Sequence, residues 1–227
     1  NTKTIFQSRF NESRFFFGFN TGQLFIVDYK AGKWEVYCKL KNVSGVTDSY
    51  VELENGDILI LTSFPASVCK IPVNDSIPVK YTAEQGVPEI GLNYLFEDNG
   101  KIILSTDIGL YQLNIKNDKW EPCDYLTGNY SKKHKVDALF RRQNGDLWIS
   151  TNEDRYYDIY FRNVNDSLIM TKGGPLDVLP NLKYRFLSEI DGKVWIAKSN
   201  SIYIIDDSKL NNPFPAVQTL LTKIVIS

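Results

Sequence analysis

The stretch that decides the fold is Asn144-Gly145-Asp146-Leu147-Trp148-Ile149-Ser150-Thr151. Asn-Gly supplies the positive φ angles that tight hairpin turns need, and the apolar run behind it is typical of a strand buried on both faces. The same pattern returns at residues 55–62, 99–106 and 191–198, with a degenerate copy at 13–19. The four turn glycines follow one another at intervals of 44, 45 and 47 residues, so the chain is predicted to be a repeat protein.

Further apolar segments accompany each copy of this pattern. One precedes the turn, as at residues 92–97, and another follows the first strand, as at residues 109–114. A fourth is visible at residues 33–37 and again at 119–121. Four short strands per repeat are the signature of a propeller blade, and no segment shows the 3.6-residue apolar period of a long helix.

The chain is therefore predicted to be all-β, a β-propeller of about five four-stranded blades, either closed or part of a larger ring of about seven. The predicted repeats cover residues 1–210, with approximate blade boundaries at 1–40, 41–84, 85–128, 129–180 and 181–210. An open ring would expose strand edges and an apolar blade face, which favours partner chains.

Composition excludes several classes of function. The chain has 227 residues, with 26 basic against 27 acidic side chains, so it lacks the positive charge that binds nucleic acid. No apolar run reaches the roughly 18 residues that span a bilayer. The sequence starts at Asn1 without a basic and apolar leader pattern, which suggests a chain that is mature, truncated or cut from something larger. Cys38, Cys69 and Cys123 are interpreted as buried structural thiols. With a single histidine they cannot form a zinc site, and no metal or cofactor is expected.

Residues 96–111 resemble the two-component regulator propeller repeat, in which Glu-Asp, a turn, Gly and a variable residue precede Leu-Trp-Ile-Gly-Thr and a later Gly-Leu. Residues 146–151 and 193–197 match the Trp-containing core of that repeat. The resemblance covers essentially the whole chain and is strongest in repeats three to five. Ser150 and Ala197 replace the usual glycine, and repeat one lacks its turn glycine, which affects blade regularity.

Such repeats are typical of periplasmic sensors of hybrid two-component systems in Bacteroidetes, where propellers precede a β-sandwich, a membrane helix and a histidine kinase. Residues 211–227 resemble the passage into that sandwich. The resemblance implies a periplasmic, non-catalytic sensor that binds a glycan-derived oligosaccharide and relays to the kinase, which other parts of the protein would carry. It also implies membrane attachment through those missing parts, and dimerisation of the full-length sensor.

The expected ligand face is the one that carries the loops between second and third strands and the connections between blades. Loop residues that break a repeat are candidates for function. Carboxylates and Arg bind sugar hydroxyls, and Tyr faces stack on sugar rings. The candidate ligand-binding residues are Asp48, Glu89 and Lys183 in the connections, and Asp107, Asn152, Glu153, Asp154, Arg155 and Tyr156 in the loops.

Three alternative functions stay open. A propeller that only binds other proteins needs no small-molecule site. A five-bladed glycosidase needs two carboxylates, but no spacing indicates a pair. Residues 28–34 suggest a quinone-type dehydrogenase, although they also predict a strand, a turn and a strand. No catalytic residue is assigned, because a Ser or Cys nucleophile would have to use His134 in the basic loop 131–135.

Overall fold

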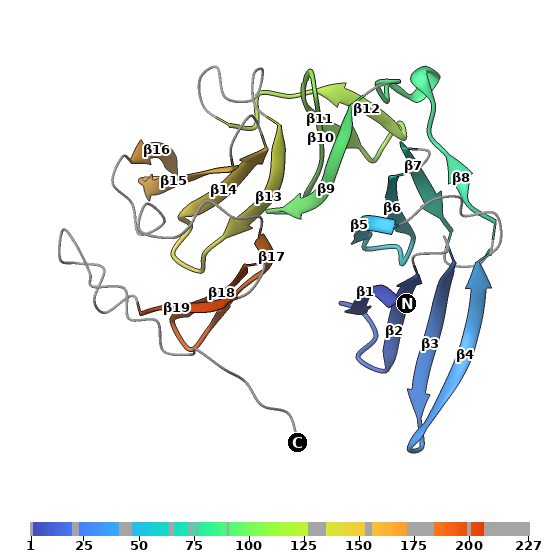
Figure 1. Ribbon diagram of the computed structural model, residues 1–227. Helices are drawn as coiled ribbons and strands as arrows, with labels where there is room; N and C mark the ends of the chain where they lie inside the picture. The colour runs from blue at the N-terminus through green and yellow to red at the C-terminus, as the bar shows by residue number, and fades with distance from the viewer. Residues whose placement is uncertain are drawn as a thin grey trace. The chain divides into compact units, whose positions relative to one another are not determined.

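The computed structural model describes residues 2–19, 23–40, 47–63, 66–72, 75, 77–89, 91–126, 135–152, 156–171, 184–198 and 201–206. These residues form five antiparallel sheets, so the predicted all-β propeller fold is confirmed (Figure 1). The chain divides into two compact units, Asn1–Cys123 (unit 1) and Asp124–Ser227 (unit 2). Within the described part of the chain, no helix is long and apolar enough to cross a membrane.

Unit 1 contains three four-stranded blades, each with its strands side by side in chain order. Blade one consists of β1 (Thr2–Gln7), β2 (Arg14–Phe19), β3 (Leu24–Lys30) and β4 (Lys33–Leu40). Blade two consists of β5 (Thr47–Glu52), β6 (Ile58–Ser63), β7 (Ala66–Ile71) and β8 (Val79–Lys80), followed by the 3-10 helix η1 (Ala83–Gln85). Blade three consists of β9 (Leu92–Asp98), β10 (Lys101–Thr106), β11 (Gly109–Asn114) and β12 (Lys119–Pro122).

Unit 2 contains the remaining two sheets. Blade four consists of β13 (Val136–Arg141), β14 (Leu147–Asn152), β15 (Tyr156–Val164) and β16 (Ser167–Thr171). Blade five has three strands among the described residues, namely β17 (Tyr184–Ile190), β18 (Lys193–Lys198) and β19 (Ser201–Asp206). The number of blades in the complete ring stays a prediction.

The repeated glycine turn occurs in two forms. In blades three and five it is a two-residue turn in which both residues have positive φ, 51° and 73° at Asn99 and Gly100. In blades two and four the turn is longer. In blade two, Leu53 N donates to Asp57 O at 2.8 Å. The Asn55 side chain also accepts from Asp57 N at 3.0 Å. The prediction of a tight hairpin turn is therefore right for blades three and five and wrong for the longer turns, where an Asn side chain completes the loop.

The second strand of each blade forms the centre of the core. Residues 58–62, 102–106 and 147–151 are buried without interruption, which confirms the prediction of two covered faces for blades two to four. In blade five the prediction is wrong, because buried Val194 and Ile196 alternate with half-buried Trp195 and Ala197 along β18. Blades one and two share one apolar cluster around Phe16 and Ile60, and blades two and three share another around Leu59 and Leu104. In unit 2 the corresponding cluster joins Trp148 of blade four to Ile196 of blade five. Each apolar cluster therefore holds two consecutive blades together.

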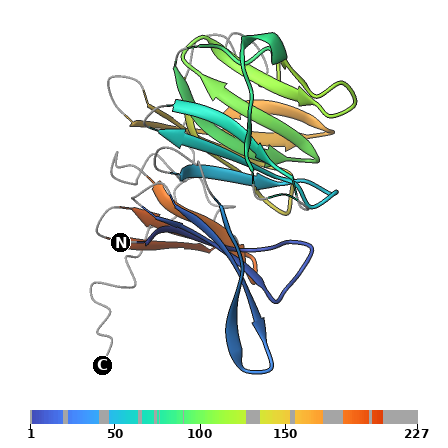
Figure 2. The same cartoon turned by 90° about the vertical axis from the view of Figure 1, so that its right-hand side faces the viewer.

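The outer hairpin of blade one is less covered. Figures 1 and 2 show β3 and β4 extending beyond β1 and β2 of the same sheet. Trp34 is 56% exposed and Val36 63% exposed, although the Trp34 ring lies 5.1 Å from Phe15 and 4.8 Å from Tyr29 between ring centroids. Within unit 1, the buried core of blade one therefore lies on its face toward blade two.

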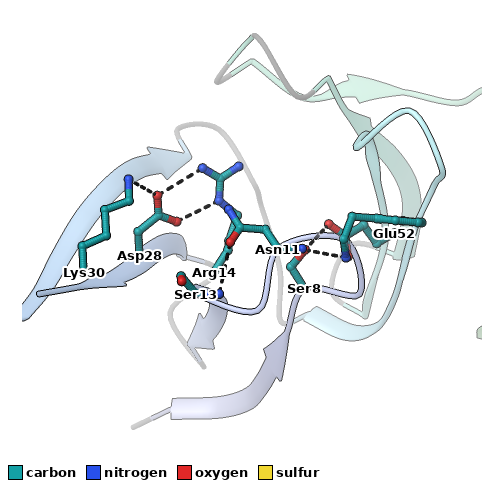
Figure 3. Close-up of polar contacts among 8 residues, drawn as sticks. Ser8, Asn11, Ser13, Arg14, Asp28, Lys30 and Glu52 are labelled. Atoms are coloured by element: carbon teal, nitrogen blue, oxygen red, sulfur yellow. Dashed lines mark hydrogen bonds and ion pairs between the residues drawn. The ribbon is translucent and has the colours of Figure 1, made fainter. Parts of the chain in front are cut away.

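Consecutive blades are also joined by a glutamate. Figure 3 shows Ser8 facing Glu52, and the Ser8 hydroxyl donates to Glu52 Oε1 at 2.7 Å. The Arg9 N–H donates to the other carboxylate oxygen of Glu52, also at 2.7 Å. Glu52 ends the first strand of blade two, so its carboxylate binds the turn of the preceding blade. The glutamate of the repeat is therefore a structural residue here, because charge-assisted hydrogen bonds of this kind are strong.

Candidate functional site

Each blade has a β-bulge in its first strand. In blade two, Thr47 pairs with Thr62 and Ser49 pairs with Leu61, so Asp48 is the additional residue of its strand. The same register shift occurs once in every other first strand. The five bulge residues are all polar or charged: Lys3, Asp48, Asn93, Asp137 and Arg185. Bulges at equivalent positions commonly lie beside functional sites, where they redirect a side chain.

The bulge corrects one sequence prediction. Asp48 was expected in a connection between blades, but it lies within β5, because the pairing of β5 with β6 continues past the bulge to Thr47. Strand β5 contacts both β1 and β9, so the bulges at Lys3, Asp48 and Asn93 lie on three neighbouring strands of unit 1. The bulge residues recur with the repeat of the sequence, but among them only Asp48 was predicted to bind a ligand.

The connection from blade two to blade three is held rigidly by its own polar groups. Thr82 caps η1, since its hydroxyl accepts from Glu84 N at 3.3 Å while Gln85 Oε1 accepts from Thr82 N at 2.9 Å. Gly86 follows with φ of 82°, and a Cβ there would stand 2.0 Å from the Trp120 carbonyl oxygen. Only glycine fits this position, so the end of η1 lies directly against β12 of blade three.

This connection brings the segment of one predicted site residue, Glu89, beside the turn that carries another, Asp107. The Asp107 N–H, in the turn between β10 and β11, donates to Gly91 O at 2.7 Å. A Cβ at Gly91 would lie 2.3 Å from Asp107 Cγ, so the carboxylate rests on the glycine backbone. Glu89 lies two residues before Gly91, and both carboxylates belong to exposed residues. One candidate from each of the two predicted groups of loops thus lies at the same end of unit 1.

A pocket of about 240 Å³ opens beside this connection. Its walls come from β7, from β8 with η1, and from the segment that leads into β9. Six of the eleven lining residues are apolar, four have polar side chains, and the eleventh is Tyr81. The lining residues are Ala66, Ser67, Val68, Lys80, Tyr81, Thr82, Ala83, Val87, Pro88, Glu89 and Leu92.

The four polar side chains differ in what they offer a ligand. Ser67 Oγ lies 2.8 Å from Thr62 Oγ1, and Thr82 Oγ1 donates to Gln85 Oε1 at 2.7 Å, so both hydroxyls already have protein partners. Lys80 and Glu89 are exposed, and neither side chain forms a hydrogen bond or ion pair with another residue of the described chain. An ammonium and a carboxylate are therefore the groups of this pocket that a ligand would meet first.

Behind the pocket, Tyr81 belongs to the structural frame. Its hydroxyl donates to Asp118 Oδ1 at 2.6 Å, and Lys70 Nζ lies 2.5 Å from Asp118 Oδ2. Burial alone would raise the pKa of Asp118, but the hydrogen bonds from Lys70 and Tyr81 outweigh it and lower that pKa. Burial, followed by the Asp118 carboxylate, raises the pKa of Tyr81. Tyr81 is therefore neutral at ordinary pH and ties blade two to blade three.

The remaining sequence candidates are placed less completely. Asn152 and Tyr156 were expected in a loop, but they are strand residues that pair with each other at the ends of β14 and β15. The cross-strand pairing continues to that point, which shortens the loop. Three candidates of the same loop, and one in a connection, lie outside the described residues: Glu153, Asp154, Arg155 and Lys183. In the described ranges, no group of three or more His, Cys, Asp or Glu residues is arranged to hold a metal ion.

Sequence reasoning missed Lys80. Fourth strands were recognised by the Lys-Trp-Glu pattern at residues 33–35 and 119–121, which blade two lacks. Strand β8 has only two residues, and Lys80 is positioned by its pairing with Cys69 of β7. No local pattern marks such a short strand, so its lysine becomes visible only through its pairing with β7.

No protein-family model matches the sequence, and no curated protein matches it. Among solved structures, the extracellular domain of the proposed hybrid two-component system BT4673 from B. thetaiotaomicron aligns over 98% of this chain, with 16% identity and a TM-score of 0.61. The corresponding domain of BT3049 aligns over 97%, with 15% identity and a TM-score of 0.57. Virginiamycin B lyase from Staphylococcus aureus, an enzyme by its name, aligns over 91%, with 14% identity and a TM-score of 0.60.

The chain covers 30% and 34% of the two sensor domains, so it spans about a third of their length. Identities at this level establish a shared fold and leave function to the site. The chain has the β-propeller fold of the extracellular domains of B. thetaiotaomicron two-component systems.

Proposed function

We propose that this chain is a ligand-sensing propeller of an extracytoplasmic two-component protein, and that its ligand is an oligosaccharide derived from a glycan. The observation that carries the proposal is the pocket beside Glu89, which lies at the end of unit 1 where the predicted loops meet. Its volume of about 240 Å³ is below the roughly 300–1,000 Å³ of sites for drug-sized ligands, which suits one sugar ring. The carboxylate accepts hydrogen bonds from sugar hydroxyls, and the Lys80 ammonium donates to them.

The relay to a kinase is part of the same proposal. The fold shared with sensor domains supports a periplasmic location and a kinase elsewhere in a longer protein. Signal transfer would use rigid-body shifts between domains, and dimerisation would take place in the full-length sensor. In this scheme the propeller binds the ligand and performs no chemistry.

Thermal unfolding of the purified chain with a panel of plant and host oligosaccharides tests ligand binding. A ligand that binds only the folded state at about ten times Kd stabilises it by about 1.4 kcal/mol. For a chain of this size that corresponds to a rise in Tm of about 3–6 °C. We expect one glycan class to produce this rise.

Variants locate the site. Glu89→Gln removes the charged acceptor and should reduce the rise, and Arg155→Ala tests the candidate loop of blade four in the same way. Glu35→Gln, an exposed carboxylate of blade one, is the control and should leave the rise unchanged. A chain that melts cooperatively and responds to no glycan would contradict the oligosaccharide proposal and favour a protein-binding propeller.

A glycosidase is the second candidate, because Glu89 and Asp107 lie on adjoining segments. Glycosidases place two carboxylates on opposite sides of the scissile bond. The oligosaccharide that raises the Tm should therefore be incubated with the chain and assayed for new reducing ends. Release of sugar that Glu89→Gln abolishes would replace the sensor proposal with a hydrolase.

A further inference from the structure

Lys80 is a charge for which the described fold shows no structural use. It lies on the two-residue strand β8 and lines the pocket, and its side chain forms no ion pair or hydrogen bond with the described residues. The other lysine of this region, Lys70, is bound to Asp118 at 2.5 Å and belongs to the frame. An exposed ammonium at a pocket rim remains solvated until an anion replaces its water.

The pocket is poorly built for a neutral sugar. Recognition of neutral rings relies on exposed aromatic faces, yet Tyr81, the aromatic residue of the lining, is 4% exposed. Its hydroxyl is already committed to Asp118. Ser67 and Thr82 also have protein partners, so a neutral ring would gain few new hydrogen bonds here.

A charged contact can bind a sugar in this pocket, where the lining offers no exposed aromatic face for stacking. We infer that the sugar unit entering this pocket is a uronic acid, whose carboxylate binds the Lys80 ammonium while its ring hydroxyls donate to Glu89. Lys80 and Glu89 come from different segments, β8 and the connection into β9, and both line the same pocket. Pro88 and Leu92, which are partly exposed, supply apolar contacts for the ring. This inference rests on the proposed oligosaccharide function and narrows it to acidic glycans.

The net charge of the chain would not produce a preference for acidic sugars. Its formal charge is −1, so long-range attraction does not draw anions to it. A measured preference for the acidic ligand would therefore come from a local group. Hydrogen bonds between charged partners are about twice as strong as neutral ones, so we expect at least about tenfold tighter binding than for an uncharged analogue.

Calorimetric titration of the complete 227-residue chain tests this. The probes are tetrasaccharides that contain galacturonate, glucuronate or mannuronate, each compared with the same tetrasaccharide after its carboxyl groups are reduced to alcohols. Free uronate monosaccharides form a further arm, which separates a site for small sugar acids from one that needs the oligosaccharide. For one acid we expect at least about tenfold tighter binding than for its reduced form, and the ratio should fall as salt is added.

Substitutions test whether Lys80 produces the ratio between the affinities for the acid and for its reduced form. Lys80→Gln should bring the ratio close to one, because the acid loses much more affinity than its reduced form does, while Lys80→Arg keeps the charge and should keep most of the ratio. Lys33→Gln, which removes an exposed lysine of blade one, is the matched control and should change neither affinity. Because Lys80 is exposed, these substitutions should leave Tm within about 1 °C, which a melting curve checks.

The outcomes separate the two proposals. Equal affinity for an acid and its reduced form would overturn the uronate inference and leave the oligosaccharide proposal standing. An acid preference that survives Lys80→Gln would overturn the role of Lys80. Absence of binding by every acidic and reduced probe would overturn the inference, and the thermal screen with neutral glycans would then decide the wider proposal separately.

Discussion

Asp28, in blade one, is 2% exposed and keeps its charge through two cations. Arg14 Nε lies 2.8 Å and Lys30 Nζ 3.0 Å from its carboxylate oxygens, as Figure 3 shows. The hydrogen bond from Arg14 is the largest influence and lowers the pKa of Asp28, against the effect of burial, and Lys30 adds to it. The ionised carboxylate is therefore the form that the folded state prefers.

This pKa shift predicts a dependence of stability on pH. A carboxyl group whose folded pKa is depressed stabilises the fold above its unfolded value, and this contribution is lost as pH falls through the folded pKa. We expect Asp28→Asn to lower the free energy of unfolding by about 1–3 kcal/mol at pH 7, and by less below the unfolded value of 3.8. Urea titrations at pH 7 and pH 3 measure the two differences.

Glu35→Gln is the matched control for Asp28. Glu35 is the cross-strand partner of Asp28 in β4 and is exposed. Its substitution should change the free energy of unfolding by less than about 0.5 kcal/mol at either pH. A loss for Asp28→Asn that is the same at both pH values would show that packing, and not charge, produces the effect.

Between β13 and β17 of unit 2, a buried ion pair repeats the glutamate contact of blades one and two. Glu189 accepts from Arg142 Nη2 at 3.0 Å and from the Gln143 N–H at 2.8 Å. The side chains of Arg142 and Glu189 are 1% and 7% exposed. Removal of one partner from a buried pair leaves the other charge poorly compensated, which costs more than the pair itself contributes.

We expect Glu189→Leu to lower the free energy of unfolding by about 3 kcal/mol. The double variant Arg142→Met/Glu189→Leu should recover most of this loss, because apolar side chains of similar volume replace both charges. Arg162→Met, an exposed position of β15, serves as the control. Urea unfolding of the wild type, Arg142→Met, Glu189→Leu and the double variant gives the coupling energy, and a double variant no more stable than Glu189→Leu alone would contradict this account.

Unit 1 contains two complete interfaces between blades. The clusters around Leu59 and around Phe16 use residues of unit 1 alone. In repeat architectures stability is approximately a sum over repeats and their nearest-neighbour interfaces. A chain cut after Cys123 therefore keeps the interfaces that stabilise its three blades.

We expect residues 1–123 expressed alone to unfold cooperatively, with a Tm below that of the full chain. Far-UV circular dichroism during heating measures this, and Leu59→Ala in the same fragment should lower its stability by about 2–5 kcal/mol. A fragment without β-sheet signal or without a transition would show that the blades of unit 1 require the rest of the chain.

The candidate ligand-binding residues stay a prediction, but the positions expected for them can be compared with the structure. Glu89 and Asp107 were selected from two kinds of loop, and the structure places their segments side by side. Asp48 was assigned to a loop although it lies in β5, because sequence alone does not show where strand pairing ends. Lys80 was missed, since a two-residue strand has no period to detect.

The sequence by itself determined the all-β class, the blade repeat and the positions of most strands. These follow from local causes: an Asn-Gly or Asp-Gly turn every 44 to 47 residues and an apolar run behind it. Only the tertiary structure decided the bulges of the first strands, the contact of Gly91 with Asp107, and the pocket that combines Lys80 with Glu89. These features depend on register and on packing between segments from different strands and blades, and no local pattern of side chains encodes such distances.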